Sequence, residues 1–423
     1  MESRTDRKFA QALDRQDALA AYRSRFAIPE PGLLYMDGNS LGRLTLQSAE
    51  RARELVENEW GRELVRGWNK GWYEAPLRVG DKIGKLTGAA PGQMAIADST
   101  SINLFKLACA ALQLRPGRSK IITDTLNFPS DLYILQGAAR LAGAGHAIVT
   151  IPARDDDIRP DLPALAAAID EQTALVALSH VVFKSGYMYD MAEITRLAHE
   201  KGALVLWDLS HSAGVLPIEL DACQVDFAVG CTYKYLNGGP GSPAFLYVNR
   251  HRQAEAVSPI WGWFGQSAPF DFGLEYAPTQ GIARFLAGTP PMLSLLAMEA
   301  ALDPLLEAGL EAMRAKSIRL TEYFIDLNDE LLAPLGFILG SPREAEQRGG
   351  HVSLRHAEGY RINCALIDEM DVIPDFREPD NIRFGFAPLY TTFDELWQVA
   401  ERIRRLVTEK RYEKYPKERL SVT

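Results

Sequence analysis

The feature that most constrains the fold of this 423-residue chain is a regular alternation of short apolar runs with helical patterns. The runs have the length and aliphatic content of buried strands, and they cover residues 120–123, 147–151, 174–178, 203–207, 227–230 and 244–248. Asp190 and Glu193 predict a capping box that begins a helix, and Lys201-Gly202 predicts its end. Apolar strands joined by helices predict a mainly parallel sheet flanked by helices, with any ligand at the carboxyl ends of the strands.

The C-terminal part of the chain has a different pattern. Residues 310–331 have the spacing of a long amphipathic helix, and short apolar stretches at 351–355 and 381–384 predict strands, so we expect a smaller α+β unit there. A charged helix and an extended apolar segment near the N-terminus could pack on this unit. We therefore predict a large ligand-binding domain at residues 51–300 and a discontinuous small domain formed by residues 1–50 and 301–423.

Composition and charge exclude several classes of protein. Apolar residues make up 47% and charged residues 24%, which excludes a mostly disordered or collagen-like chain. The net charge of −9 argues against nucleic acid as a partner. The four cysteines lie far apart, so neither a disulfide framework nor a metal site is expected. Residues 1–16 lack the apolar core of a secretory signal and no long apolar window occurs, so we expect a cytoplasmic protein that does not bind membranes.

Two ionisable residues follow neighbouring strands of the predicted sheet. Asp208 comes directly after the run at 203–207, and Lys234 follows the next run, between two tyrosines and before a glycine-rich stretch. Most lysines are solvated surface groups, and an aspartate at a strand end is often only the cap of a turn. At this edge, however, a lysine can form a Schiff base, and a carboxylate can pair with the ring nitrogen of pyridoxal phosphate. His211 either contacts such a cofactor or fills the turn.

A polar turn at residues 98–101 could hold the phosphate of that cofactor. The turn precedes an apolar helical stretch, so the hydroxyls of Thr100 and Ser101 and the free N–H groups of the first helical turn are available, although such clusters are usually only caps. Phe128 offers a flat face for stacking on an aromatic ring. Ser130 is expected to cap the helix that follows.

These residues belong to segments that resemble those of kynureninases, which are fold-type I pyridoxal-phosphate enzymes. The resemblance covers most of the chain and rests on Tyr35-Met36-Asp37-Gly38-Asn39-Ser40-Leu41-Gly42, Phe128-Pro129-Ser130-Asp131, Trp207-Asp208-Leu209-Ser210-His211, Tyr233-Lys234-Tyr235-Leu236-Asn237, Gly262-Trp263-Phe264-Gly265 and Arg383-Phe384-Gly385. It implies an α/β fold of the fold-type I PLP-dependent transferase-like class. It also implies hydrolysis of L-kynurenine, or also of 3-hydroxykynurenine, to anthranilate or 3-hydroxyanthranilate and L-alanine in tryptophan catabolism.

The resemblance implies a role for each candidate site residue. Lys234 would carry the cofactor and act as a base at the substrate Cα, Asp208 would face the ring nitrogen, and Tyr233 would relay a proton or only bind the phosphate. The implied cofactor-binding set is Thr100, Ser101, Phe128, Pro129, Ser130, Asp131, Ser179, Asp208, His211, Tyr233, Lys234, Trp263 and Thr289. Trp263 and Thr289 would reach across from the neighbouring subunit of a homodimer, so that the phosphate site is shared.

Arg383 would clamp the α-carboxylate of the substrate bidentately, although it could also be a surface ion-pair residue. The substrate-binding set would include Trp68 and Gly288. Gly288-Thr289 stands where some animal kynureninases have Ser-Asn, and Trp68 stands where they have His. This combination resembles bacterial members that favour kynurenine over its 3-hydroxy analogue, while Trp68 could equally be a structural aromatic residue.

Three other functions remain open from the sequence. Another fold-type I enzyme, such as a cysteine desulfurase or a small-molecule lyase, would share the lysine and aspartate, but no cysteine stands in an obviously flexible, electropositive setting. A nicotinamide oxidoreductase would fit the alternating pattern, but the glycine fingerprint after an N-terminal strand is missing. A catalytically inactive binding protein is disfavoured by the presence of Lys234, Asp208 and Arg383.

Overall fold

The computed structural model describes residues 4–143 and 145–418, and its main feature is a seven-stranded sheet. In spatial order the strands are β2 (Met94–Ile96), β10 (Phe245–Val248), β9 (Phe227–Gly230), β8 (Leu204–Asp208), β7 (Thr173–Ser179), β3 (Lys120–Asp124) and β4 (Ala147–Ile151). Only β10 runs against its neighbours, since it pairs antiparallel with β2 and β9. The mainly parallel sheet is therefore confirmed, with all six predicted strands in it and a short seventh, β2, that was not predicted.

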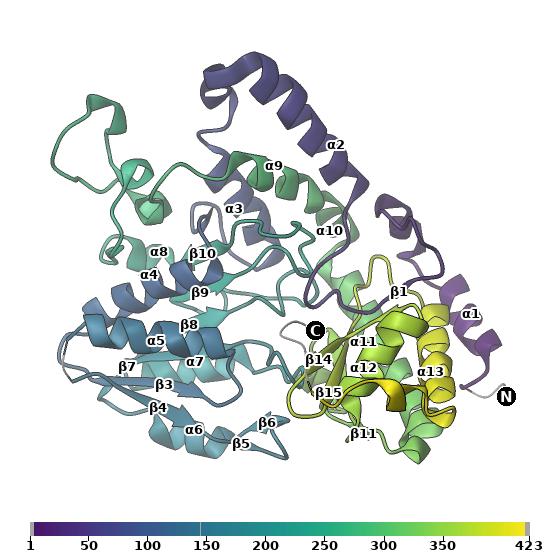
Figure 1. Cartoon of the computed structure of the whole chain (residues 1–423). Helices are drawn as coiled ribbons and strands as arrows, with labels where there is room; N and C mark the ends of the chain where they lie inside the picture. The colour runs from purple at the N-terminus through teal and green to yellow at the C-terminus, as the bar shows by residue number, and fades with distance from the viewer. Residues whose placement is uncertain (1–3, 144, 419–423) are drawn as a thin grey trace.

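Helices cover both faces of this sheet (Figure 1). They are α3 (Ala75–Leu86), α4 (Thr100–Gln113), α5 (Pro129–Leu141), α6 (Leu162–Ala168), α7 (Met191–Glu200) and α9 (Met292–Ala301). Neighbouring residues of β8 enter different cores: Leu206 packs with residues of α4 and α5, whereas Trp207 packs with residues of α3, α7 and α9. The strands are thus buried on both faces, as their unbroken apolar runs predict. As expected, α7 begins after Asp190, whose carboxylate accepts from the Glu193 N–H.

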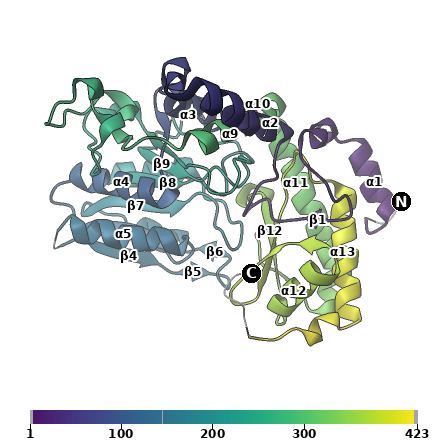
Figure 2. The same ribbon diagram turned by 45° about the horizontal axis from the view of Figure 1, so that its top comes forward.

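A smaller unit lies beside the large sheet (Figures 1 and 2). Its antiparallel sheet has the order β11 (Ile338–Leu339), β12 (His351–Arg355), β15 (Asn381–Gly385) and β14 (Asp375–Arg377). It packs with α11 (Leu310–Leu327), α12 (Gly359–Glu369) and α13 (Phe393–Thr408) around its own hydrophobic core. The predicted small α+β unit is therefore present.

The N-terminal segment joins this smaller unit. Helix α1 (Arg7–Arg15) lies along α13, where the Asp14 carboxylate accepts from the backbone N–H groups of Phe393 and Asp394 at 2.7 and 2.9 Å. Strand β1 (Leu34–Tyr35) pairs parallel with β13 (Val372–Ile373). The remaining short elements are α2 (Leu46–Glu54), β5 (Ala153–Arg154), β6 (Arg159–Pro160), α8 (Arg250–Gln253) and α10 (Asp303–Ala308).

Two further features concern the segment before α9 and the length and polarity of the helices. The segment between α8 and α9 extends away from the large sheet (Figure 1). Across residues 4–143 and 145–418, every helix is too short or too polar to cross a membrane.

Candidate active site

The candidate site begins at the carboxyl ends of the central strands. Asp208 is the last residue of β8 and pairs in register with Ser179, the last residue of β7. Lys234 follows β9, the next strand across the sheet. The sequence-based expectation that these side chains come from adjacent strand ends is confirmed, and this is the edge where open parallel sheets bind ligands.

Lys234 and His211 are in direct contact. The Nζ atom of Lys234 lies 2.9 Å from Nε2 of His211, and it also lies 6.0 Å from the centre of the Tyr233 ring. Burial, followed by the charge of Lys234, lowers the pKa of His211 well below its ordinary value. The imidazole is therefore neutral and accepts a hydrogen bond from the lysine, while its buried Nδ1 has no partner within the described residues.

A pair of carboxyl groups lies beside this lysine. Asp131, in the first turn of α5, has its pKa raised well above the ordinary value by burial and then by the charge of Asp208, while the charge of Lys234 opposes this shift. Its Oδ2 is buried without a partner among the described residues. Because Asp208 and Lys234 both act on Asp131, the three groups lie within one site.

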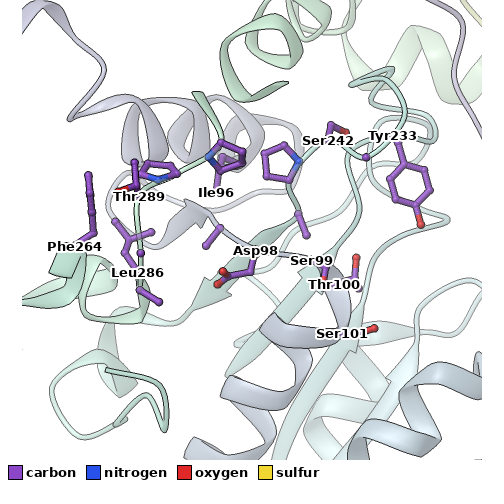
Figure 3. A pocket seen from close by; sticks show the side chains of 18 residues that line it. Ile96, Asp98, Ser99, Thr100, Ser101, Tyr233, Ser242, Phe264, Leu286 and Thr289 are labelled. Atoms are coloured by element: carbon purple, nitrogen blue, oxygen red, sulfur yellow. The ribbon is translucent and has the colours of Figure 1, made fainter. Parts of the chain in front are cut away.

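A cavity of about 480 Å³ opens next to Tyr233 (Figure 3). Figure 3 shows Tyr233, Thr100 and Ser101 on one side and Thr289 with Phe264 and Leu286 on the other. Ser99 caps α4, so the free N–H groups of the first turn of that helix lie at this cavity. Four of the predicted phosphate-binding residues, Thr100, Ser101, Tyr233 and Thr289, therefore line one cavity within a single chain, and Gly288 lines it too.

The start of α5 differs from the sequence prediction. Ser130 is not the N-cap: the helix begins at Pro129 with Phe128 as its N-cap, because proline fits the first helical position without losing a hydrogen bond. Ser130 instead lies with its Oγ 3.1 Å from the Oγ of Ser101, which joins the first turns of α4 and α5. Phe128 is 43% exposed and meets the ring of Phe183 edge-on at 5.2 Å.

Arg383 is 2% exposed, so its interpretation as a surface ion-pair residue is wrong. Its guanidinium pairs with Asp375, with Nε 2.6 Å from Oδ1, and it also donates to the carbonyl oxygen of Phe183. Since the Phe183 ring contacts Phe128, Arg383 lies near the predicted stacking residue.

Neither Trp68 nor Trp263, both predicted to belong to the site, lines this cavity in a single chain. Trp263 contacts Phe270 and Phe272, with ring centres 5.8 and 5.3 Å apart, and is 42% exposed. Trp68 packs against Trp72 and Phe264 at 5.6 and 5.7 Å. Phe264 lines the cavity and separates it from Trp68, so Trp68 has the position of a structural aromatic residue.

Several residues of the site were missed by the sequence analysis. The Oδ1 atom of Asn127 accepts a 2.6 Å hydrogen bond from the Ser179 hydroxyl. The sequence indicates Asn127 only by its position directly before Phe128. Cys231 is buried beside Tyr233 and Asp208, and its charge contributes to the pKa shift of Tyr233. His351, in β12, has its ring 5.5 Å from that of His211, and burial lowers its pKa to about 3.

The fold is shared with several solved structures. The cysteine desulfurase CsdA from Escherichia coli aligns with a TM-score of 0.78 and 18% identity, over 93% of this chain and 98% of that one. A cysteine desulfurase from Thermococcus onnurineus NA1 aligns with a TM-score of 0.75 and 20% identity, over 89% and 95% of the two chains. Both likenesses, at 18 and 20% identity, show a shared fold, the fold-type I arrangement of a large, mainly parallel sheet beside a small antiparallel one.

The particular family follows from more similar sequences. A family model described as the kynureninase C-terminal domain matches residues 313–403. The kynureninase of Pseudomonas fluorescens is 44% identical over 411 residues, which is 96% of each chain, and that of Burkholderia pseudomallei (strain 1106a) is 44% identical over 95% of each chain. The chain belongs to the kynureninase family and is a hydrolase that depends on pyridoxal phosphate.

Proposed function

We propose that this protein hydrolyses L-kynurenine, and 3-hydroxykynurenine less efficiently, to anthranilate or 3-hydroxyanthranilate and L-alanine. The observation that carries this proposal is the 44% identity to kynureninases over nearly the whole chain, combined with Lys234, Asp208 and Arg383 around one site. A cysteine desulfurase is disfavoured, because burial raises the pKa of Cys231 and raises that of Cys109 to about 11.

The residues present fit the cofactor. Buried polar atoms without partners in the described chain, Asp131 Oδ2 and His211 Nδ1, lie beside Lys234 and suit the polar groups of a pyridine ring. We assign attachment to Lys234, the ring nitrogen to Asp208, stacking to Phe128, and the phosphate to the hydroxyls that line the cavity. The remaining contacts are assigned to Pro129, Ser130, Asp131, Ser179 and His211.

When bound, pyridoxal phosphate supplies an electron sink for the negative charge that develops on the substrate during bond cleavage. The amine of Lys234 takes the proton from the substrate Cα, and the Asp208 carboxylate holds a proton at the ring nitrogen. Cys231 and burial raise the pKa of Tyr233, so its hydroxyl keeps its proton near neutral pH, and we assign to this hydroxyl the proton that the β-carbon of the product receives.

Arg383 binds the α-carboxylate of the substrate in this proposal, and its burial makes that interaction strong. Phe128, Trp263 and Gly288 are assigned to the aryl group, and Trp68 supports the Phe264 wall from behind. Gly288 adds no side chain to the cavity, and the apolar character of the aromatic side chains favours kynurenine over its hydroxylated analogue.

A homodimer with a shared phosphate site is supported by exposed apolar side chains on the segment that extends from the large sheet. Trp263 is 42% exposed, Phe270 66%, Phe272 68% and Leu274 103%. Such a patch is typical of a protein–protein interface, and a second subunit would cover it and bring Trp263 toward a phosphate site. Sedimentation of the purified protein tests this, and a monomer at micromolar concentration would contradict it.

We also propose the domain division at residues 51–300 and at 1–50 with 301–423. The pairing of β1 with β13 and the packing of α1 on α13 support assigning the N-terminal segment to the small domain. A cytoplasmic location is supported by the free thiols of all four cysteines, Cys109, Cys223, Cys231 and Cys364.

The function is tested by incubating the protein, loaded with pyridoxal phosphate, with kynurenine and with 3-hydroxykynurenine separately. We expect fluorescent anthranilate to form with the higher kcat/KM from kynurenine, and none from Lys234→Ala. Release of sulfide or persulfide from cysteine, without anthranilate from kynurenine, would favour the desulfurase alternative.

A further inference from the structure

A buried cluster of charges surrounds Arg383 where the N-terminal segment meets the small sheet. Asp375 and Arg377 come from β14, Arg383 comes from β15, and Asp37 and Ser40 come from the segment after β1. Asp37 forms an isolated β-bridge with Gly385, the last residue of β15. Asp375 and Arg383 are buried, and Asp37 and Arg377 lie half-buried beside them.

The cations of this cluster are paired with only one of the two carboxylates. Asp375 accepts from Arg383, with Nε 2.6 Å from Oδ1, and pairs with Arg377, whose Nη2 is 2.9 Å from Oδ2. The hydroxyl of Ser40 donates to the same Oδ2 at 2.6 Å. Asp37 takes part in no ion pair with the described residues, and its buried Oδ1 has no hydrogen-bond partner among them.

The unequal pairing of the two carboxyl groups with arginines determines which of them binds a proton more readily. Two arginines and one ionised Asp375 leave one excess positive charge, which an ionised Asp37 would cancel and a neutral Asp37 would leave in place. Burial, and then repulsion by Asp375, raises the pKa of Asp37 to about 7. Burial alone would raise the pKa of Asp375 too, but the charge and hydrogen bonds of Arg383 hold it below its ordinary value.

The other groups that face Asp37 do not titrate near neutral pH. Burial raises the pKa values of Tyr35, Tyr235 and Tyr390, and the imidazole pKa values of His211 and His351, across the site, are lowered by burial. The guanidinium groups of Arg377 and Arg383 stay protonated. Asp37 is thus the group of this cluster that exchanges a proton in the physiological range.

We propose that Asp37 takes up a proton when the α-carboxylate of the substrate binds Arg383, so that substrate binding is linked to the protonation of Asp37. This inference rests on the proposed role of Arg383 in the kynureninase reaction. An arriving carboxylate adds a negative charge to a cluster that has one excess positive charge only while Asp37 is neutral. Asp37 acts on Arg383 through its charge, so it sets the pH range in which the cluster has the excess positive charge that favours binding of an anion.

The direction of the pH effect follows from this linkage. The bound carboxylate raises the pKa of Asp37 above its value in the free enzyme. Below the free-enzyme pKa, Asp37 is already protonated and affinity does not change with pH. Above it, binding requires proton uptake, so KM rises toward a limit of about tenfold per pH unit until the pKa of the complex is reached.

The test compares Asp37→Asn with Asp37→Glu in the enzyme loaded with pyridoxal phosphate. Between about pH 6 and about pH 9, we expect KM of the wild-type enzyme and of Asp37→Glu to rise with pH, and KM of Asp37→Asn to lack this rise. The change should be larger in KM than in kcat. A KM profile of Asp37→Asn that coincides with that of the wild-type enzyme would overturn the proposal.

A second measurement does not depend on catalysis. Calorimetric titration of the wild-type enzyme and of Asp37→Asn with L-alanine near pH 8, in two buffers of different ionisation enthalpy, reports the protons taken up. We expect greater uptake on binding L-alanine by the wild-type enzyme than by Asp37→Asn, since the ligand amine exchanges the same protons with both proteins, and equal uptake by the two proteins would overturn the proposal. If kynurenine is not hydrolysed but this difference is observed, the proposed function fails and the linkage stands.

Discussion

The Nζ atom of Lys234 lies 2.9 Å from Nε2 of a neutral, buried His211. This contact holds the amine at the carboxyl edge of the sheet. We predict that Lys234→Ala removes the visible absorbance of the purified protein, because the amine that attaches the cofactor is lost. Lys201→Ala, a change at a lysine that is 45% exposed and pairs with Glu171, is the control and should leave the spectrum unchanged. A yellow Lys234→Ala protein that stays coloured after dialysis would exclude the assigned role.

The carboxyl pair of Asp208 and Asp131 gives a second prediction. Asp208→Asn should retain cofactor but lower kcat by about 10²–10³-fold, the usual cost of removing one electrostatic partner of a transition state. Asp131→Asn should have a much smaller effect, because burial and the charge of Asp208 raise the pKa of Asp131 and so favour its uncharged form, which an amide resembles. Steady-state kinetics of both variants provide the check, and equal losses would contradict the separate roles.

Replacing Arg383 with lysine should raise KM more than it lowers kcat. Lysine cannot reproduce the planar fork that now pairs with Asp375, and loss of one charged hydrogen bond corresponds to about a 10- to 100-fold weaker interaction. Arg355→Lys, in the neighbouring strand β12, is the control because Arg355 pairs with Asp380 outside the site. Similar KM values for Arg383→Lys and the wild-type enzyme would remove Arg383 from substrate binding.

Lys106 provides a prediction about the phosphate cavity. Its fully buried ammonium pairs with Asp98, which lines the cavity, and donates to the carbonyl oxygen of Phe285 at 2.7 Å, just before the segment that carries Thr289. Lys106→Met should therefore separate two walls of the cavity and weaken binding of pyridoxal phosphate by about tenfold. Binding of pyridoxal, which has no phosphate, should change less, as measured by absorbance titration. Lys82→Met, at a half-buried lysine of α3, is the control, and equal weakening of both ligands would indicate only general destabilisation.

The strands and the two central site residues could be predicted because their signals are local. An unbroken apolar run identifies a strand buried on both faces, and the residue after its end lies at the carboxyl edge wherever the strand is placed, as for Asp208 and Lys234. The direction of β10 could not be predicted, since an apolar run looks the same in either direction. The N-cap of α5 was wrongly predicted at Ser130, because Pro129 takes the first helical position and makes Phe128 the N-cap.

The contacts that complete the site are not local, and this is why they were missed. Asp37 and Asp375 are separated by most of the chain, and the pairing of β1 with β13 and the bridge between Asp37 and Gly385 bring their segments together. His351 becomes part of the site because β12 lies beside β15, and neither strand has a pattern that indicates its partner. Such residues are found from the tertiary structure or from a resemblance that covers the whole chain.

Gly42 connects the N-terminal segment to the lysine loop and gives the last prediction. Its N–H donates to the carbonyl oxygen of Tyr233 at 2.7 Å, and a Cβ at this position would lie 2.3 Å from the carbonyl oxygen of Lys234. Gly42→Ala must therefore displace the loop, at a cost of about 1–3 kcal/mol in the free energy of unfolding, and we expect weaker cofactor absorbance with it. Gly32→Ala is the control, because nothing lies within 4 Å of its added Cβ. Unfolding curves and absorbance spectra of both variants provide the check, and a Gly42→Ala protein with the wild-type spectrum would show that the loop tolerates displacement.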